Sequence, residues 1–355
     1  MLKEDRKPIF ASNAPHIRDG SSVKKVMWTV VLALMPAAVY SVYIFGPRVL
    51  ELYAVSVLAA VISEIIIRTL LEKKMSSLDG SAVITGILVA MNVPPSSPIW
   101  MSAIGSVFAI VIVKQLFGGL GFNIFNPALA ARAFMLASWP VYMTTGWTVF
   151  ENIDVISQIS AGAPDLPHEV FEVMTHATPL AALKEGSRLL AEYDIKIEEF
   201  CALLFSPGMI WAQFKGSIKG CVGETSAILL FAGGIILLVR RVITWHIPAA
   251  YIISMAVLTF IYYSIVGYPR PQMIALSHIL TGGLMLGAFF MATDMVTSPI
   301  SGKGMLLFGA GCGLITFVIR IWGGYPEGVS YAILLMNATV PLIDRFTKPK
   351  VWGYD

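Results

Sequence analysis

The stretch GSAVITGILVAMNVPP, residues 80–95, is followed 202 residues later by GGLMLGAFFMATDMVT, residues 282–297. Both stretches are apolar and open on glycine, and Asp294 stands in the second where Asn92 stands in the first. Duplicated apolar halves with interrupted helices are a common way to build a site near the middle of a bilayer. The pattern therefore predicts a duplicated membrane unit.

The composition is that of an integral membrane protein. Hydrophobic residues make up 56% of the chain, charged residues 13%, and the mean hydropathy is +0.74, whereas a soluble domain carries roughly 25% charged residues. The net charge of +3 is too small to indicate nucleic-acid binding. Residues 1–25 lack a short apolar core, so no signal peptide is expected. The cysteines and histidines show no metal-ligand spacing, so no metal site is expected.

Ten apolar runs approach or exceed the length that crosses a bilayer, about 17–25 residues. The longer runs lie near residues 26–44, 49–70, 98–117, 224–243, 246–267, 302–322 and 328–346, and the shorter or interrupted ones near 80–93, 127–143 and 275–293. Gly121 and Gly323 keep the offset of 202 residues. The ten runs therefore divide into two halves of five runs each. An odd number inverts the second half in the membrane. We expect an all-α polytopic membrane protein of about ten transmembrane helices in two inverted five-helix repeats, with interrupted helices and a large extracytoplasmic loop.

The expected boundaries follow from these runs. Residues 1–25 form a cytoplasmic segment, 26–143 the first repeat, 144–223 the extracytoplasmic loop, 224–346 the second repeat and 347–355 a cytoplasmic tail. Basic residues gather in the segments that this arrangement places in the cytoplasm, as the positive-inside rule requires. They are Lys3, Arg6, Lys7, Arg18, Lys24, Lys25, Lys73, Lys74, Lys114, Arg240, Arg241, Lys303, Arg345, Lys348 and Lys350.

The long loop contains the stretch THATPLAALK, residues 175–184. Thr178 followed by Pro179 is typical of the first turn of a short helix, and that structural role alone accounts for the pattern. It is compatible with binding, because a helix start also favours a phosphate group. Long ordered loops tend to carry function, so this loop is a candidate site.

Several stretches together resemble one family of membrane proteins: APHIR at 14–18, FNPALAAR at 125–132, THATPLAALK at 175–184, GETS at 223–226, FMATD at 290–294 and PEGVS at 326–330. Over nearly the whole chain, the sequence is similar to the D subunits of the Rnf electron-transport complexes. It is more distantly similar to the membrane-embedded B subunits of the sodium-pumping NADH:quinone oxidoreductases. The resemblance implies electron transfer from reduced ferredoxin towards NAD, coupled to movement of Na⁺ or H⁺.

The resemblance also implies a cofactor. In the family, a threonine is esterified by the phosphate of FMN, and the matching acceptor is Thr178, surrounded by Thr175, His176 and Ala177. His176 stands where the family often has glycine. Riboflavin is a further expectation, carried over from the sodium-pumping relatives.

Other candidate residues lie near the ends of the apolar runs. Gly223, Glu224 and Thr225 would line the flavin or a partner surface; alternatively, they begin the next helix, with Glu224 near its positive end.

Asn126 and Arg132 are candidates for flavin contact. Arg132 is suited to a phosphate, a flavin carbonyl or a partner carboxylate, or it extends to the membrane surface. Asp294 and Asn92 are expected to line an ion path near the middle of the membrane, or simply to end their helices. Glu64 in the second run is expected to be buried and paired, with no partner identifiable in the sequence.

The chain is not expected to be catalytic alone. It has no dinucleotide-binding glycine motif and no cluster cysteines, so NAD and iron–sulfur chemistry would belong to partners, the A, B, C, E and G subunits of an Rnf complex. The lipid bilayer is the other expected partner, and the location is the inner or plasma membrane of a prokaryote. The alternatives are the B subunit of the sodium-pumping oxidoreductase and a urea-transporter-like channel.

Overall fold

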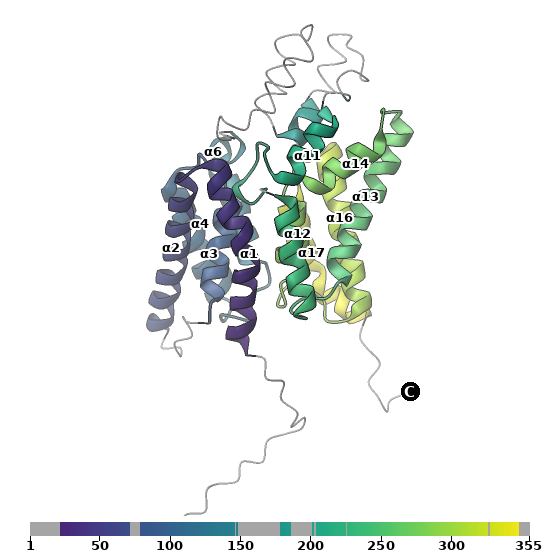
Figure 1. Ribbon diagram of the computed structural model, residues 1–355. Coiled ribbons are helices and arrows are strands. Elements are labelled where there is room, and N and C mark those ends of the chain that lie inside the picture. The colour runs from purple at the N-terminus through teal and green to yellow at the C-terminus, as the bar shows by residue number, and fades with distance from the viewer. Residues whose placement is uncertain are drawn as a thin grey trace, which may run out of the picture.

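The computed structural model describes residues 22–71, 79–145, 147, 178–185, 201, 204–224, 226–325 and 327–347. Within these ranges the regular structure is helical and contains no β-strand. Figure 1 shows two groups of helices side by side, one formed by the first part of the chain and one by the second. Residues 1–21 of the expected N-terminal segment, most of the expected loop and most of the expected tail lie outside the described residues. The remainder of the expected N-terminal segment already belongs to the first helix and its cap.

The first group of helices begins at a capped end. The helices are α1 (Val23–Phe45), α2 (Arg48–Leu70), α3 (Ser81–Met91), α4 (Ile99–Phe108), which continues as the π-helix η1 (Ala109–Gln115), α5 (Pro127–Ser138) and α6 (Pro140–Thr144). Ser22 Oγ accepts a hydrogen bond from Lys25 N at 3.2 Å, which caps α1. Helix α3 ends at Asn92, because the prolines at 94 and 95 cannot continue it.

The second group contains a break inside one membrane segment. The helices are α11 (Pro207–Lys215), the 3₁₀ helix η2 (Val222–Glu224), α12 (Ala227–Val239), α13 (His246–Val266), α14 (Pro271–Leu280), α15 (Leu284–Leu286), which continues as the π-helix η3 (Gly287–Met291), α16 (Gly302–Trp322) and α17 (Val329–Phe346). Gly282 and Gly283 have φ angles of +66° and +68°, which glycine adopts at little cost. They separate α14 from the segment 284–291, and the two axes differ by 59°.

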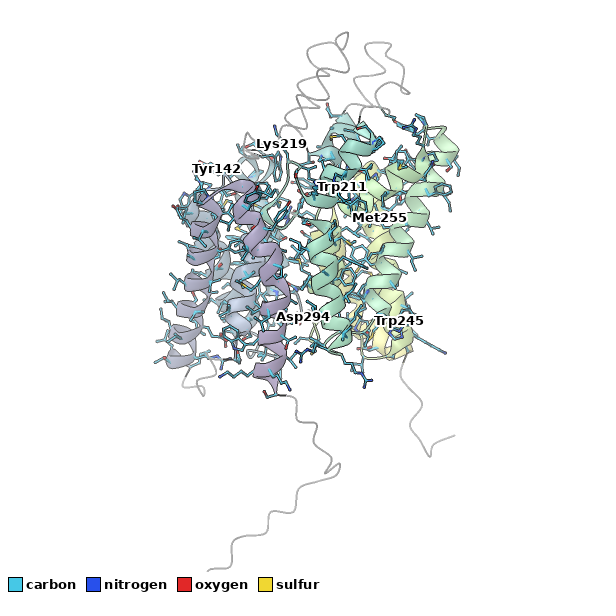
Figure 2. All side chains as sticks on the ribbon, in the orientation of Figure 1. Tyr142, Trp211, Lys219, Trp245, Met255 and Asp294 are labelled. Carbon is cyan, nitrogen blue, oxygen red and sulfur yellow. The ribbon has the colours of Figure 1, made fainter. Side chains whose placement is uncertain are left out.

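Where the two groups meet, α1 packs on α12 and η2, α3 packs on η2, and α5 packs on α17. One apolar cluster runs through both groups and includes Leu34 of α1, Met135 of α5 and Phe308 of α16. Figure 2 places Tyr142, Trp211 and Lys219 at one end of the bundle, and Trp245 and Asp294 at the other. We call the first the loop end. The second is the terminal end, because α1 starts there and α17 finishes there.

The helices agree with the predicted apolar runs, with local differences. The run at 127–143 is split at Trp139 and Pro140 into α5 and α6. The run at 224–243 yields a shorter helix, because Ser226 caps α12 and the helix ends before Arg240. Among the described residues, α1, α2, α13 and α16 are long and apolar enough to cross a membrane, and the bent α14–η3 pair passes the same test when it is counted as one span. The protein is therefore a multi-pass membrane protein whose described part is all-helical.

Candidate functional site

Arg132, on α5, joins the two groups of helices. Its Nη1 donates to the backbone carbonyl of Asn92 at 2.8 Å, to Asn92 Oδ1 at 3.3 Å and to Cys221 Sγ at 3.2 Å. Its Nη2 pairs with Glu327 Oε2. Arg132 is buried, so the alternative in which it extends to the membrane surface is wrong. We call Arg132, Asn92, Cys221, Glu224 and Glu327 the arginine cluster.

Asn126 positions the helix that carries Arg132. Its Oδ1 accepts hydrogen bonds from Ala128 N at 3.0 Å and Leu129 N at 3.2 Å, which is the geometry of an N-cap. Its Nδ2 donates to the carbonyl of Met291 at 3.2 Å, in the second group of helices. The same side chain therefore starts α5 and ties it across the contact between the groups.

Glu224 and Arg320 hold the break between α14 and α15 from opposite sides. Glu224 Oε2 accepts a hydrogen bond from Gly282 N at 3.2 Å, and Arg320 Nη2 donates to the Gly282 carbonyl at 3.1 Å. These bonds satisfy backbone groups that the interrupted helix leaves free. Glu224 does not cap α12, because that position belongs to Ser226, whose Oγ accepts from Leu229 N at 3.3 Å.

Thr178 is buried beside a cavity of about 300 Å³. Its Oγ1 accepts a hydrogen bond from Ala181 N at 3.3 Å, so it begins the helix at residues 179–185, as the sequence predicts. One wall of the cavity carries Tyr325 and Tyr331, whose rings are stacked with centroids 5.9 Å apart and planes 25° apart. Arg132 and Glu327, which pair with each other, also line it. The cavity thus combines a hydroxyl, a planar aromatic surface and an ion pair.

The helix that follows Thr178 is anchored to the second group of helices. Leu183 lies in an apolar cluster with Ile274 of α14. Lys184 Nζ donates to the carbonyl of Gly323, at the end of α16. Partial burial lowers the pKa of Lys184, and the charge of Glu185 opposes that shift. These contacts fix the position of Thr178 relative to the cavity.

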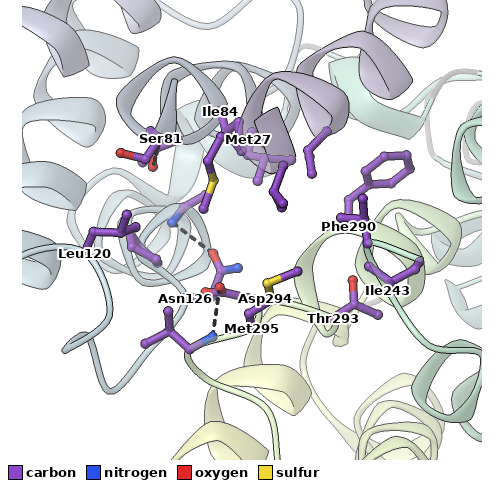
Figure 3. Close-up of a pocket in the computed structure, with 18 of the residues that line it drawn as sticks. Met27, Ser81, Ile84, Leu120, Asn126, Ile243, Phe290, Thr293, Asp294 and Met295 are labelled. Carbon is purple, nitrogen blue, oxygen red and sulfur yellow. Dashed lines mark hydrogen bonds between the residues drawn. The ribbon is translucent and has the colours of Figure 1, made fainter. Parts of the chain in front are cut away.

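A second cavity of about 120 Å³ lies at the terminal end, between the two groups of helices (Figure 3). Asp294 lies in its wall and forms a local turn, in which Oδ1 accepts from Val296 N at 3.3 Å and Oδ2 accepts from Thr297 Oγ1 at 3.4 Å. Most of the lining is apolar. Its polar members are Ser81, Thr85, Lys114, Asn123, Asn126, Thr293 and Asp294.

Beside this cavity, Glu64 is buried and paired, as predicted. Its Oε1 accepts from Lys114 Nζ at 3.0 Å, Gln115 Nε2 at 2.9 Å and Arg68 Nη2 at 3.1 Å. Lys114 also donates to Ser81 Oγ at 2.7 Å. We call these five residues the glutamate cluster. Lys114 and Gln115 lie on the π-helix η1, a distortion that is frequent at functional sites.

The structure separates two residues that the sequence paired. Asn92 lies in the arginine cluster, whereas Asp294 lines the cavity at the terminal end, so they do not share a described cavity. Asn126 lines the cavity of Asp294, and Gly223 lines the small cavity of the arginine cluster. Four predicted residues, Thr175, His176, Ala177 and Thr225, lie outside the described residues, so their roles stay predictions.

Comparison with known proteins places this arrangement in a family. Residues 10–353 match the model of the NQR2, RnfD, RnfE family. The D subunit of the Na⁺-translocating ferredoxin:NAD⁺ oxidoreductase complex of Acetobacterium woodii is 43% identical, over 97% of this chain and 95% of the relative. The D subunit of the proton-translocating ferredoxin:NAD⁺ oxidoreductase complex of Clostridium ljungdahlii is 44% identical, over 98% and 97%. The D subunit of the ion-translocating oxidoreductase complex of Stutzerimonas stutzeri is 39% identical, over 94% and 93%. The chain belongs to the NQR2, RnfD, RnfE family.

Proposed function

We propose that this chain is the D-type membrane subunit of an ion-translocating ferredoxin:NAD oxidoreductase complex, and that it carries FMN esterified to Thr178. The three relatives described above, all named as D subunits, are 39–44% identical along almost their whole length. Hydride and iron–sulfur chemistry belong to the other members of the complex, the A, B, C, E and G subunits. The relatives named for sodium and for protons are equally similar to this chain, at 43% and 44% identity, so the proposal names no ion.

The cavity beside Thr178 is the observation that carries the cofactor proposal. Its volume of about 300 Å³ is in the range of small-molecule sites. The stacked rings of Tyr325 and Tyr331 offer a planar surface to an isoalloxazine ring, and the ion pair of Arg132 and Glu327 offers polar groups to the edge of that ring. The Thr178 hydroxyl is already fixed at the cavity wall. A channel or a carrier of small solutes would need none of these features.

Bound FMN would supply electron transfer through its ring. Thr178 would hold the phosphate through its Oγ1, and the tyrosine rings would exclude water from one face. The ion pair of Arg132 and Glu327 would face a polar edge of the flavin, and the bonds of Arg132 to Asn92 and Glu327 keep its guanidinium in place. The chain therefore contributes a fixed flavin position between partners that exchange electrons with it.

Replacement of Thr178 tests the attachment. Thr178→Ala should abolish the covalent flavin, because alanine has no hydroxyl to esterify. Thr144→Ala is the matched control, since Thr144 lines the same cavity and should keep the flavin. The measurement is in-gel flavin fluorescence after denaturation, with the mass of the intact chain. A Thr178→Ala chain that still fluoresces at its own mass would refute the assignment.

We also propose that the helices form two inverted five-helix repeats. Helices α3, α4 and α5 begin at residues 81, 99 and 127, and α15, α16 and α17 begin at 284, 302 and 329. Each pair is thus 202 or 203 residues apart. Because α15 belongs to the bent α14–η3 segment, the ten membrane segments are α1, α2, α3, α4 with η1, α5, α12, α13, α14–η3, α16 and α17.

In this arrangement the terminal end faces the cytoplasm. Described basic residues at helix ends gather there, including Lys24 and Lys25 of α1, Lys303 of α16 and Arg345 of α17. The loop end, with Thr178, would then face outward. A cysteine placed at Ser160 should react with a membrane-impermeant thiol reagent in intact cells, and one placed at Ser76 should not. Reversed labelling would rule out this orientation.

The cavity at the terminal end is the proposed position of a second, non-covalent flavin of the riboflavin type, whose entry would require this cavity of about 120 Å³ to widen. Its mixed lining, with Asn126, Thr293 and Asp294 among apolar side chains, suits a ring with polar edges. Arg132 lines the other cavities and takes no part. Chromatography of flavin released by denaturation from the Thr178→Ala chain measures this ligand without interference from FMN. Absence of any released flavin would count against it.

A further inference from the structure

Three potential metal ligands from distant parts of the chain meet inside the arginine cluster. Cys221 Sγ and one carboxylate oxygen each of Glu224 and Glu327 lie within 4.8 Å of one another. Cys221 and Glu224 are buried, and Glu327 is half-buried. All three line a cavity of about 10 Å³, which is room for one water molecule or one small cation. The cavity is therefore large enough for one ion and too small for a larger ligand.

Each carboxylate is anchored by one oxygen and offers the other. Glu224 Oε2 accepts from Gly282 N, which leaves the buried Oε1 with no hydrogen-bond partner among the described residues. Glu327 Oε2 pairs with Arg132, while Oε1 lies 3.9 Å from Cys221 Sγ. A buried carboxylate oxygen without a partner costs free energy that a bound cation would recover. Secondary contacts of this kind also orient the ligands of metal sites.

The type of ligand, rather than net charge, indicates which cation fits. The guanidiniums of Arg132 and Arg320 both lie beside the two carboxylates, so the charges around the cluster balance. A sulfur ligand selects zinc-like transition metals over Na⁺, Mg²⁺ and Ca²⁺, which prefer oxygen alone. Ligand atoms of a tetrahedral zinc site lie roughly 3.5 Å apart, since the bonds are about 2.0–2.3 Å. Closing the cluster around the ion needs movement of about 1 Å.

We propose that Cys221, Glu224 and Glu327 form a site for a divalent transition-metal ion of the zinc class, with a fourth position open to water. Binding forms a metal–sulfur bond and releases the thiol proton to solvent, with no transfer of electrons. Arg132 remains paired with Glu327 Oε2 outside the coordination shell. Arg132 and Glu327 also line the cavity beside Thr178, so that cavity is the route to the site. Occupancy of the site should change the surroundings of Thr178.

Zinc binding by the full-length chain tests this site. The purified chain, incubated with ZnCl₂ and desalted, should retain one Zn²⁺ per chain. Titration against a competing chelator should show affinity at least tenfold weaker for Cys221→Ser and for Glu224→Gln. Cys312→Ser is the matched control, because Cys312 is equally buried in α16, outside the cluster, and it should bind as the unsubstituted chain does. A chain that retains no zinc, or a Cys221→Ser chain that binds normally, would overturn the proposal.

A second measurement needs no substitution at the site. Added Co²⁺ should produce a thiolate-to-metal charge-transfer band in the difference spectrum of the unsubstituted chain, and its absence would reject cysteine ligation even if a variant misfolds. The site does not depend on FMN, so the Thr178→Ala chain should bind zinc equally well. Failure of the flavin proposal would thus leave zinc binding intact, and failure of zinc binding would leave the flavin proposal intact.

Discussion

The glutamate cluster and the arginine cluster are both buried groups of opposite charges, but they join different parts of the molecule. Glu64 binds residues of α2 and η1, all within the first group of helices, and its side chain is fully shielded from solvent. Arg132 connects α5 with Glu327 in the second group, and the Glu327 side chain is 17% exposed beside a cavity. Arg132 and Glu327 line a cavity directly, whereas Glu64 is enclosed and only its partners Ser81 and Lys114 reach the wall of the cavity at the terminal end. The glutamate cluster therefore stabilises one half, whereas the arginine cluster is placed to respond to what binds between the halves.

The largest loss of stability is expected when Glu64 is replaced. Glu64→Ala leaves Lys114 and Arg68 buried without the carboxylate that they share, which should destabilise the fold by about 3–5 kcal/mol. Thermal unfolding of the purified chain in detergent, together with its yield from membranes, measures this loss.

Glu51→Ala is the matched control, because Glu51 is an exposed acidic residue at the start of the same helix. It should unfold at nearly the temperature of the unsubstituted chain. If the two substitutions lower the unfolding temperature equally, the glutamate cluster does not stabilise the first half.

A smaller loss of stability is expected at Arg132. Arg132→Ala removes the bonds to Asn92 and Cys221 and the pair with Glu327, but water from the adjacent cavity can solvate the exposed groups. The cost should be about 2 kcal/mol, between those of exposed and buried ion pairs. Arg132→Ala should also lower the amount of FMN that stays bound to the complex, because Arg132 lines the cavity beside Thr178. Glu64→Gln should leave the amount of bound FMN unchanged. If Arg132→Ala lowers the unfolding temperature more than Glu64→Ala does, the arginine cluster contributes more to stability than the glutamate cluster, contrary to this prediction.

The two clusters also show how far the sequence can predict such sites. Glu64 is predicted to be buried and paired, because an unpaired charge is costly at membrane depth. The sequence alone identified no partner for it, although Arg68 lies four residues further along the same helix. Lys114 is predicted to lie on the cytoplasmic side, whereas it is buried against Glu64, because α4 and η1 pack on α2.

The arginine cluster was harder to predict, because its contacts also depend on how distant helices pack together. Cys221 and Glu327 lie 89 and 195 residues from Arg132, and no spacing rule connects them. The position of Glu327 carried one overlooked signal: the offset of 202 residues pairs it with the apolar Phe125. The helices themselves were predictable, because long apolar runs and proline or glycine breaks act locally. Contacts between the halves were not.

The smallest effect on stability is expected at Asp294, which belongs to neither cluster and lines the cavity at the terminal end. Asp294→Asn keeps the shape of the side chain and the turn, since an amide oxygen can still accept from Val296 N. The substitution should therefore change stability by less than about 1 kcal/mol. It removes a negative charge from the wall of the cavity at the terminal end, where a carboxylate can attract a cation that an amide holds weakly. Electron transfer by the reconstituted complex in sealed vesicles should continue, with fewer ions moved per electron when ferredoxin and NAD are supplied. Asp344→Asn, at the same end but outside the cavity, should keep normal coupling. If Asp294→Asn also moves the normal number of ions per electron, Asp294 serves only its turn, and the ion path lies elsewhere.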